Sequence, residues 1–192
     1  MKCLQQFEDI KNSTRSLTKI TSTDTTRVLL KLADEAEKDI ENLLAENQKD
    51  LVRMEKSNPK YDRLLLTADR IKSIASEIRN VATLPAPVGE ILEEKVLPNG
   101  LKMSRKRVPL GVVGVIYEAR PNVTFDVFSL CLRSGNAVVL KGSSDAEFSN
   151  IAIAKLIKQV LVSEGVDSNI VQLLSPDRYA AEELMNAVGY VD

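Results

Sequence analysis

A polar segment, EARPN at residues 118–122, carries side chains suited to binding a negatively charged oxygen. The guanidinium of Arg120 can bind a phosphate or carboxylate through two parallel N–H groups, and the amide of Asn122 can donate to an oxyanion. Glu118 offers another use for Arg120, because the two side chains could form an internal ion pair. Asn122 is also a favoured residue for capping a following helix. The segment therefore predicts either an anion site or a structural turn.

A second polar segment, KGSSD at residues 141–145, combines one lysine with two serines. Each polar segment follows a short run of β-branched and aliphatic residues, Val112–Ile116 and Ala137–Leu140, which predict strands. In open α/β sheets, ligands bind outside the carboxyl ends of the strands. Both segments are thus expected on the functional edge of one sheet.

The residues that are missing exclude several kinds of chemistry. The chain has no histidine, which removes Ser-His and Cys-His arrangements, and Cys3 and Cys131 lie far apart without a CxxC spacing. A disulfide framework and a zinc site are therefore not expected, and no metal site is predicted. Cys131 lies in the apolar stretch FDVFSLCLRSG and is expected to be buried rather than reactive.

The elements around the polar segments follow an alternating order. A helix at 123–133 connects the first two predicted strands, and a helix starting at Ser144 or Asp145 and ending near residue 163 follows the second strand. A third strand at 170–174 precedes a helix capped by Ser175, and residues 190–192 begin a fourth strand. The order β-α-β-α-β-α-β predicts a parallel, Rossmann-like sheet with right-handed crossovers.

Residues 1–84 read as an antiparallel layer of helices. Helices are expected at 5–15, from a cap at Ser22 or Thr23 through Leu44, at 46–55, and from a cap at Thr67. Residues 85–107 read as a linker followed by a β-hairpin, because Asn99-Gly100 separates two extended runs. The second run, LKMSRKR, is either a solvated edge strand or a protruding arm that pairs with another subunit.

The composition limits the partners. Lys plus Arg number 26 and Asp plus Glu number 27, so electrostatics give no reason to expect a nucleic acid or an anionic membrane. No apolar run approaches the ~18 residues of a membrane span, and the first residues do not resemble a signal peptide. A cytoplasmic location is expected.

Several motifs resemble one known family. VPLGVVGVIYEARPNVT at 108–124 and LRSGNAVVLKGSS at 132–144 closely resemble the gamma-glutamyl phosphate reductase family, within the aldehyde dehydrogenase superfamily. The resemblance extends to DRLLLT at 62–67, LPAPVG at 84–89, LPNGL at 97–101 and AVGYVD at 187–192, so it covers nearly the whole chain.

The resemblance implies an NADPH-dependent reduction of L-glutamate 5-phosphate to L-glutamate 5-semialdehyde with release of phosphate, in proline biosynthesis. It assigns residues 108–192 to an aldehyde dehydrogenase-type NADP-binding domain, preceded by the helical layer and the hairpin arm. The nucleophilic cysteine of the superfamily lies in a catalytic domain downstream of the position matching Asp192. The chain is therefore interpreted as the front part of a longer enzyme, inactive alone. Implied partners are a second copy bound through residues 90–107 and glutamate 5-kinase.

The resemblance also implies roles for single residues. Asn122 matches the superfamily's oxyanion-binding asparagine, and Arg120 beside it is a candidate for binding the substrate. Lys141, with Gly142, Ser143 and Ser144, matches the segment that contacts the adenosine ribose. Many NAD-linked relatives have a glutamate where this chain has Ser144, and a carboxylate there would repel a 2′-phosphate, so NADP is favoured over NAD.

Two other functions remain open from the sequence. One is a binding or oligomerisation module without catalytic activity, which would use the helical layer and residues 90–107 as its working surface. The other is a different member of the superfamily, such as an aldehyde dehydrogenase that reduces acyl-CoA, although YEARPN argues against it.

Overall fold

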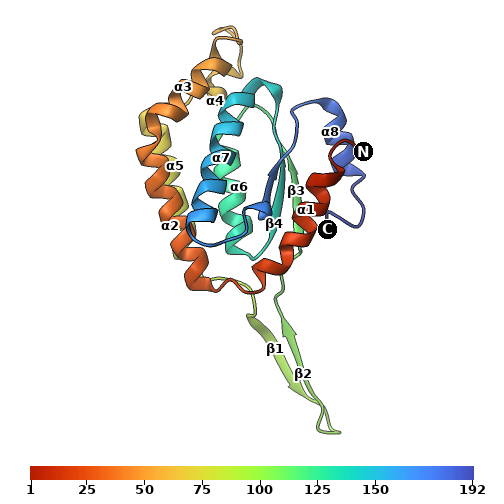
Figure 1. The fold of residues 1–192 in the computed structure, drawn as a ribbon. Coiled ribbons are helices and arrows are strands. Elements are labelled where there is room, and N and C mark those ends of the chain that lie inside the picture. The colour runs from red at the N-terminus through yellow and green to blue at the C-terminus, as the bar shows by residue number, and fades with distance from the viewer.

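A parallel sheet of three strands lies at the centre of the protein, in a computed structural model that describes residues 1–192 (Figure 1). The strands β3 (Val112–Ile116), β4 (Ala137–Lys141) and β5 (Val171–Leu173) lie in the order β3-β4-β5. All five residues of β4 are buried, because the strand is central and both faces of the sheet are covered. The predicted βαβ core and the parallel sheet are confirmed.

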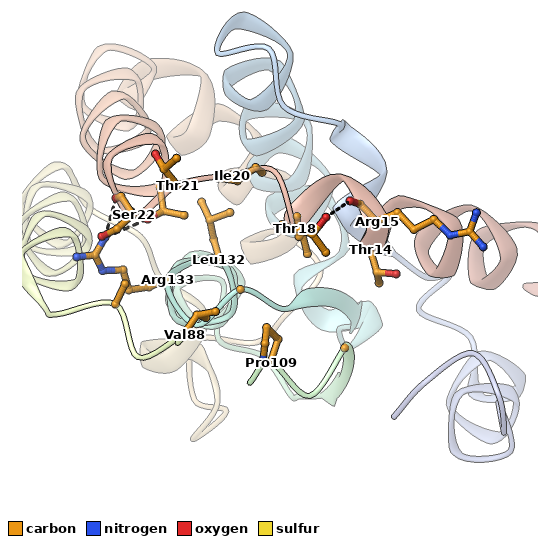
Figure 2. Close-up of a pocket in the computed structure, with 15 residues that line it drawn as sticks. Thr14, Arg15, Thr18, Ile20, Thr21, Ser22, Val88, Pro109, Leu132 and Arg133 are labelled. Atoms are coloured by element: carbon orange, nitrogen blue, oxygen red, sulfur yellow. Dashed lines mark hydrogen bonds between the residues drawn. The ribbon is translucent and has the colours of Figure 1, made fainter. Parts of the chain in front are cut away.

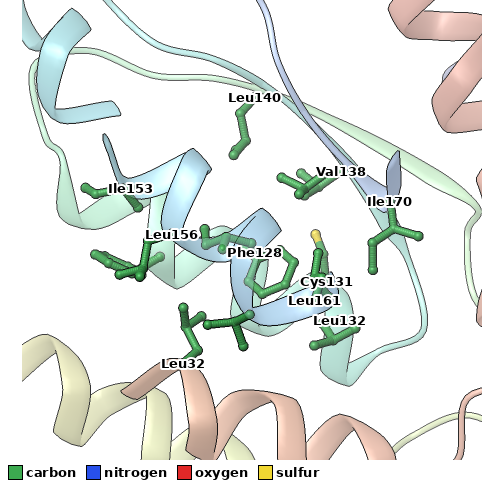
Figure 3. Close-up of a cluster of buried hydrophobic side chains, with 14 of the residues drawn as sticks. Leu32, Phe128, Cys131, Leu132, Val138, Leu140, Ile153, Leu156, Leu161 and Ile170 are labelled. Carbon is green, nitrogen blue, oxygen red and sulfur yellow. The ribbon is translucent and has the colours of Figure 1, made fainter. Parts of the chain in front are cut away.

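The helices α6 (Asn122–Arg133) and α7 (Glu147–Ser163) cover one face of the sheet. Phe125, Phe128 and Leu132 of α6 recur at helical spacing and are nearly completely buried. Figure 3 shows the resulting core, in which side chains of α6 and α7 meet those of β4 and Leu32 of α2. Both helices begin at the carboxyl edge of the sheet, because each follows one of the parallel strands β3 and β4.

A second helical layer packs outside α6 and α7 and contains α2 (Ser22–Lys38), α3 (Ile40–Leu51), α4 (Tyr61–Leu64) and α5 (Ala68–Thr83). The expected helix through residue 44 is instead interrupted at Asp39, which has ψ of 15° and accepts a hydrogen bond from the Asn42 amide. Aspartate is a poor residue for a helix interior because its side chain competes for local hydrogen bonds.

Two of the predicted caps are tested directly by the structure. Thr67 caps α5 as expected, since its hydroxyl accepts from Arg70 N–H. The cap of α2 is Thr21 rather than Ser22 or Thr23, because Thr21 and Asp24 form a reciprocal capping box.

The first helix, α1 (Leu4–Leu17), lies on the other face of the sheet together with α8 (Arg178–Met185). Phe7 and Ile10 of α1 are fully buried, and the ring of Phe7 stacks on that of Tyr190 at 6.2 Å between centroids. The helical layer expected for residues 1–84 therefore excludes α1, whose apolar stripe covers the sheet directly.

The last predicted strand does not form. Asp192 N–H donates to Val112 O at 3.0 Å beside the free edge of β3, but otherwise only an isolated bridge joins Val188 and Val191. A single bond to β3 does not make a ladder. The helix before it begins at Arg178, not after a Ser175 cap, because Asp177 has an extended conformation and occupies the cap position. The Pro176 carbonyl accepts from Lys141 at 2.8 Å.

The hairpin is confirmed and projects from the amino edge of the sheet (Figure 1). Strands β1 (Ile91–Val96) and β2 (Lys102–Lys106) pair antiparallel, and Gly100 has a φ of +85° in the turn between them. Every residue of both strands is exposed. None of the helices combines the length and apolar character needed to cross a bilayer.

Candidate functional site at the carboxyl edge of the sheet

Three loops meet where the parallel strands end. Tyr117 N–H, after β3, donates to Lys141 O at 3.1 Å, and Leu174 N–H, after β5, donates to Leu140 O at 2.8 Å. The loops that follow β3, β4 and β5 are therefore neighbours. The two polar segments singled out in the sequence both belong to this edge.

A cavity of about 180 Å³ lies between the loops after β4 and β5. Its lining residues are Gly142, Ser143, Glu147, Asn150, Ile151, Leu173, Leu174, Ser175 and Pro176. Gly142 and Ser143 are thus placed as the sequence predicts, whereas Ser144 is exposed in a short 3-10 turn, Ser144–Ala146. Ser143 caps that turn by accepting from Asp145 N–H at 3.1 Å, so the predicted cap at Ser144 or Asp145 is wrong.

Lys141 is buried and connects the two loops. Its ammonium donates to Pro176 O at 2.8 Å and has no carboxylate partner. An ammonium has three donors, so two N–H groups remain for a ligand. Lys141 therefore places positive charge next to the cavity lined by Pro176.

A buried chain of hydrogen bonds ends at the Asn150 amide, which packs against Gly142. Thr124 Oγ1 donates to Asn150 Oδ1 at 3.0 Å, and because a hydroxyl has one hydrogen, Tyr117 Oη must be the donor in its 2.7 Å bond to Thr124. Burial raises the pKa of Tyr117 to about 12, against the opposing effect of the bond to Thr124. A side chain at Gly142 would overlap the Asn150 amide. The backbone can approach this closely only because residue 142 is glycine.

The start of α7 is capped by a residue from a distant helix. Asp50 of α3 is buried, and its carboxylate accepts from Phe148 N–H at 3.1 Å, Ser149 N–H at 2.8 Å and Ser149 Oγ at 2.7 Å. Burial raises the pKa of Asp50, although the bonds from Ser149 and Phe148 oppose that rise. Asp50 therefore anchors the segment that carries Ser143 and Ser144.

Asn122 is the first residue of α6, not its cap, since Pro121 occupies the cap position and makes no side-chain cap bond. The Asn122 amide donates to Asp126 Oδ2 at 3.1 Å, which leaves its second N–H without a partner in the chain. Burial, and then the charge of Glu77, raise the pKa of Asp126. The free N–H of Asn122 is the donor that an oxyanion requires.

The predicted ion pair between Glu118 and Arg120 is wrong. Arg120 N–H donates to Glu118 O at 2.8 Å, but the two side chains form no ion pair and both are exposed. A pair in solvent gains little over hydration of the separate charges. Arg120 and Asn122 instead line a second cavity, of about 300 Å³, between the loop after β3 and the start of α5.

Neither cysteine can serve as a nucleophile in this conformation. Cys3 and Cys131 are both buried, as predicted for Cys131, and burial raises the pKa of each thiol to about 11. In Cys3 the neighbouring Glu183 adds to the rise. Thiolates react and thiols do not, so both side chains are inert near neutral pH.

A further cavity, of about 560 Å³, lies at the opposite edge of the sheet, where the hairpin leaves the domain (Figure 2). Its buried charge, Arg133, donates from all three guanidinium nitrogens to protein acceptors, which are Ser22 O, Leu84 O and the hydroxyls of Thr25 and Thr26. Because the Arg133 guanidinium already binds protein oxygens, this cavity has fewer charged donors available to a polar ligand than the carboxyl edge, where Lys141 has one protein acceptor.

The sequence did not assign roles to several of these residues. Arg63 and Arg70 lie in or beside the motif DRLLLT but were given no function. Glu77 is an exposed residue of α5, and nothing in the sequence sets it apart from the other exposed charges. Asn150 is a buried polar residue among the apolar residues of α7, a signal that indicates burial but not the hydrogen-bond partner.

A parallel sheet with helices on both faces defines a doubly wound type of α/β domain. Residues 7–190 match the model of the aldehyde dehydrogenase family, and the chain belongs to that family. The predicted family is thereby confirmed, as is the fold class.

Gamma-glutamyl phosphate reductases are among the relatives that are similar over most of the chain. The protein of Chlorobium phaeobacteroides (strain BS1) is 54% identical over 188 residues, which cover 98% of this chain and 45% of that protein. The crystal structure of the gamma-glutamyl phosphate reductase from Thermotoga maritima covers 100% of this chain with a TM-score of 0.94 and 30% identity, and 47% of that protein is matched. The Saccharomyces cerevisiae protein gives a TM-score of 0.88 at 26% identity over 98% of this chain and 49% of its own. The chain thus spans a little under half the length of these relatives.

Proposed function

We propose that this chain is the cofactor-binding part of an enzyme that uses NADPH to reduce L-glutamate 5-phosphate to L-glutamate 5-semialdehyde, with release of phosphate. This reaction is the second step of proline biosynthesis. The observation that carries the proposal is the similarity to gamma-glutamyl phosphate reductases, at 54% identity over 98% of the chain. The polar carboxyl edge is the structural feature consistent with it.

The cavity between the loops after β4 and β5 fits the ribose end of a dinucleotide. Gly142 lets the loop after β4 pack directly on Asn150 and so forms one wall of the cavity, and Lys141 would supply the charge that a 2′-phosphate needs. Glu147 also lines this cavity, but Arg53 lies 3.5 Å from its carboxylate and offsets its charge. When bound, NADPH supplies the hydride for the reduction.

The residues of the chain would perform two tasks at the acyl group. The second amide N–H of Asn122 would bind the oxygen that becomes negatively charged as the acyl carbon is attacked. Arg120, in the same cavity, would bind the phosphate. The attacking thiolate is not supplied here, because Cys3 and Cys131 are buried and protonated.

The cofactor assignment predicts a difference between NADPH and NADH in isothermal titration of the chain. NADPH is expected to bind more tightly, and Lys141→Ala is expected to weaken it by about tenfold by removing one charge-assisted contact. Ser144→Glu is expected to reduce the preference for NADPH through repulsion of the 2′-phosphate. Lys19→Ala and Ser163→Glu are matched controls at exposed positions away from the cavity. Equal binding of both nucleotides would contradict the NADP assignment, and no binding of either would contradict a cofactor site in this chain.

We also propose that the β1–β2 hairpin is an arm through which copies of the chain associate. A two-stranded hairpin is only marginally stable alone in water, yet this one exposes apolar side chains, with Val96 67% and Leu101 55% exposed. The β1 segment carries Glu90, Glu93 and Glu94, whereas the β2 segment carries basic residues, so the strand edges of two copies are complementary in charge.

Replacing residues 91–106 by a short Gly-Ser turn is expected to convert the oligomer to a monomer without lowering the melting temperature. The reason is that the exposed strands contribute no buried area to the domain. Light scattering after size-exclusion chromatography measures the change, with Lys31→Gln as a surface control. If the unaltered chain is already monomeric at high concentration, the proposal that copies associate through the hairpin is contradicted.

A further inference from the structure

The side-chain amide of Asn122 has two ends that differ in chemistry. Its NH2 group has two donors, whereas its oxygen has only acceptors, and a half-turn about the last side-chain bond exchanges the two ends. The hydrogen-bond partners of an amide decide which orientation is stable. An oxyanion meets a donor only if the NH2 group of Asn122 is held at the correct end. The residue that binds this amide therefore matters for the chemistry of the site.

Asp126 is the residue that binds the Asn122 amide. It lies one helical turn later on α6, so both side chains lie on the same face of the helix. Asp126 Oδ2 accepts from Asn122 Nδ2 at 3.1 Å, and this is the one hydrogen bond that the Asn122 side chain makes within the chain. An ionised carboxylate has acceptors but no donor. It can bind the NH2 end of the amide and cannot bind the oxygen end.

Asp126 is half-buried between α5 and α6. It lines a cavity of about 200 Å³ whose other lining residues are Glu77, Ile78, Val81, Ser129 and Leu130. Glu77 is therefore the one other charged residue of this cavity. Burial, and then the charge of Glu77, raise the pKa of Asp126, while the bond from Asn122 opposes that rise. Asp126 thus takes up a proton more readily than an exposed aspartate does.

The arginines near Asn122 do not bind Asp126. The neighbouring cavity, which Asn122 and Glu77 also line, contains Arg63, Arg70 and Arg120. None of these arginines forms a hydrogen bond or an ion pair with Asp126, whose one side-chain partner is Asn122. The protonation of Asp126 therefore depends on its burial, on Glu77 and on the bond from Asn122.

We infer that Asp126 is a positioning residue for the reaction: its ionised carboxylate holds the Asn122 amide by its NH2 end and keeps the second N–H available to an oxyanion. The inference rests on the proposed function, because that function assigns the oxyanion to Asn122. A protonated carboxyl has a donor as well as an acceptor, so it can bind either end of the amide. Protonation of Asp126 therefore removes the selection of one orientation.

Nuclear magnetic resonance of the isotope-labelled chain tests the orientation directly. Asn122→Ala identifies the NH2 signals of Asn122 by their loss. Between about pH 8 and about pH 4, these signals are expected to shift in one step as Asp126 takes up a proton. The nuclear Overhauser effect between the NH2 protons of Asn122 and the Cβ protons of Asp126 is expected to weaken in the same step, because the NH2 end no longer stays beside Asp126.

Variants and an internal control identify the group that titrates. Asp126→Asn keeps the shape of the side chain but does not titrate, so the step is expected to disappear. Glu77→Gln removes the like charge and is expected to move the step to lower pH. Glu41→Gln, the same substitution at an exposed position of α3, is expected to leave it in place. The NH2 signals of Asn136, which donates to Ser134 O and Oγ, are expected not to shift.

A step that persists in Asp126→Asn, with the native fold verified by circular dichroism, would overturn the inference. An Overhauser effect that stays constant through the step would overturn it as well. NADPH titration separates these outcomes from the proposed function. If NADPH fails to bind while the step follows Asp126, the proposed function fails and the control of the amide orientation stands. If NADPH binds but the Asn122 signals do not respond to pH, the cofactor assignment stands and Asp126 is not a positioning residue.

Discussion

Replacing Asp50 with alanine is expected to lower the free energy of unfolding by about 3 kcal/mol, because buried donors lose a charged acceptor. The carboxylate accepts three hydrogen bonds, two of them from the N–H groups of Phe148 and Ser149 in the first turn of α7. Those N–H groups have no intrahelical acceptor. Urea unfolding followed by circular dichroism measures the loss.

The matched control for Asp50→Ala is Ser149→Ala. It removes the hydroxyl that donates to Asp50 at 2.7 Å but leaves both N–H bonds intact, so a loss of about 1 kcal/mol is expected. If the two variants lose the same amount, the N–H groups find other acceptors and Asp50 is not the cap of α7.

Asp50→Ala is also expected to weaken NADPH binding, since α3 holds the loops of the site together. A small apolar cluster joins Leu51 of α3 to Leu64, to Ala119 in the loop after β3, and to Ala146 in the loop after β4. Asn47 bonds both to Leu64 O and to Ser149 Oγ. A displaced α3 would therefore disturb the proposed cofactor loop and the Arg63 segment together.

The elements that the sequence predicted well are those with local signals. The runs at 112–116 and 137–140 predict β3 and β4 because β-branched residues favour strands, and Asn99-Gly100 predicts the hairpin because few other pairs adopt its turn. The sequence correctly predicted the carboxyl edge of the sheet as the location of Arg120, Asn122 and Lys141. Residues at the end of a parallel strand, or just after it, lie at that edge whatever the rest of the fold.

The details that were missed depend on distant contacts. The α7 segment was expected to be capped by its own Ser144 or Asp145, but Asp50, about a hundred residues away, accepts from its first turn. The turn at Ser175 was read as a helix start, but α8 begins only at Arg178, and the Pro176 carbonyl between them accepts from Lys141 of the distant β4 strand. Arg63 and Glu77 could not be joined to Arg120 because only the packing of α5 beside α6 brings them to one cavity.

Replacing Gly142 with valine is expected to abolish measurable NADPH binding and to lower the free energy of unfolding by about 3 kcal/mol, the upper range for overpacking a tight site. The new Cβ would overlap the amide of Asn150 and lie 3.4 Å from Tyr117 Cζ. Asn150 cannot turn away freely, because it is buried and its Oδ1 accepts from Thr124. The loop after β4 must move instead, and with it the wall of the cavity. Isothermal titration and thermal unfolding measure the two effects.

A double variant identifies the cause. Gly142→Ala alone is expected to show a weaker form of the same loss, while Asn150→Ala removes the atoms that the new methyl group would meet. If overlap with Asn150 is the cause, the two changes together destabilise the protein by less than their sum, since the second relieves the clash made by the first. Gly142 has no positive φ, so its backbone conformation does not itself require glycine. Strictly additive losses would therefore mean that the added methyl group disturbs the loop through another contact, such as the one with Tyr117, and that packing against Asn150 is not the reason for glycine at this position.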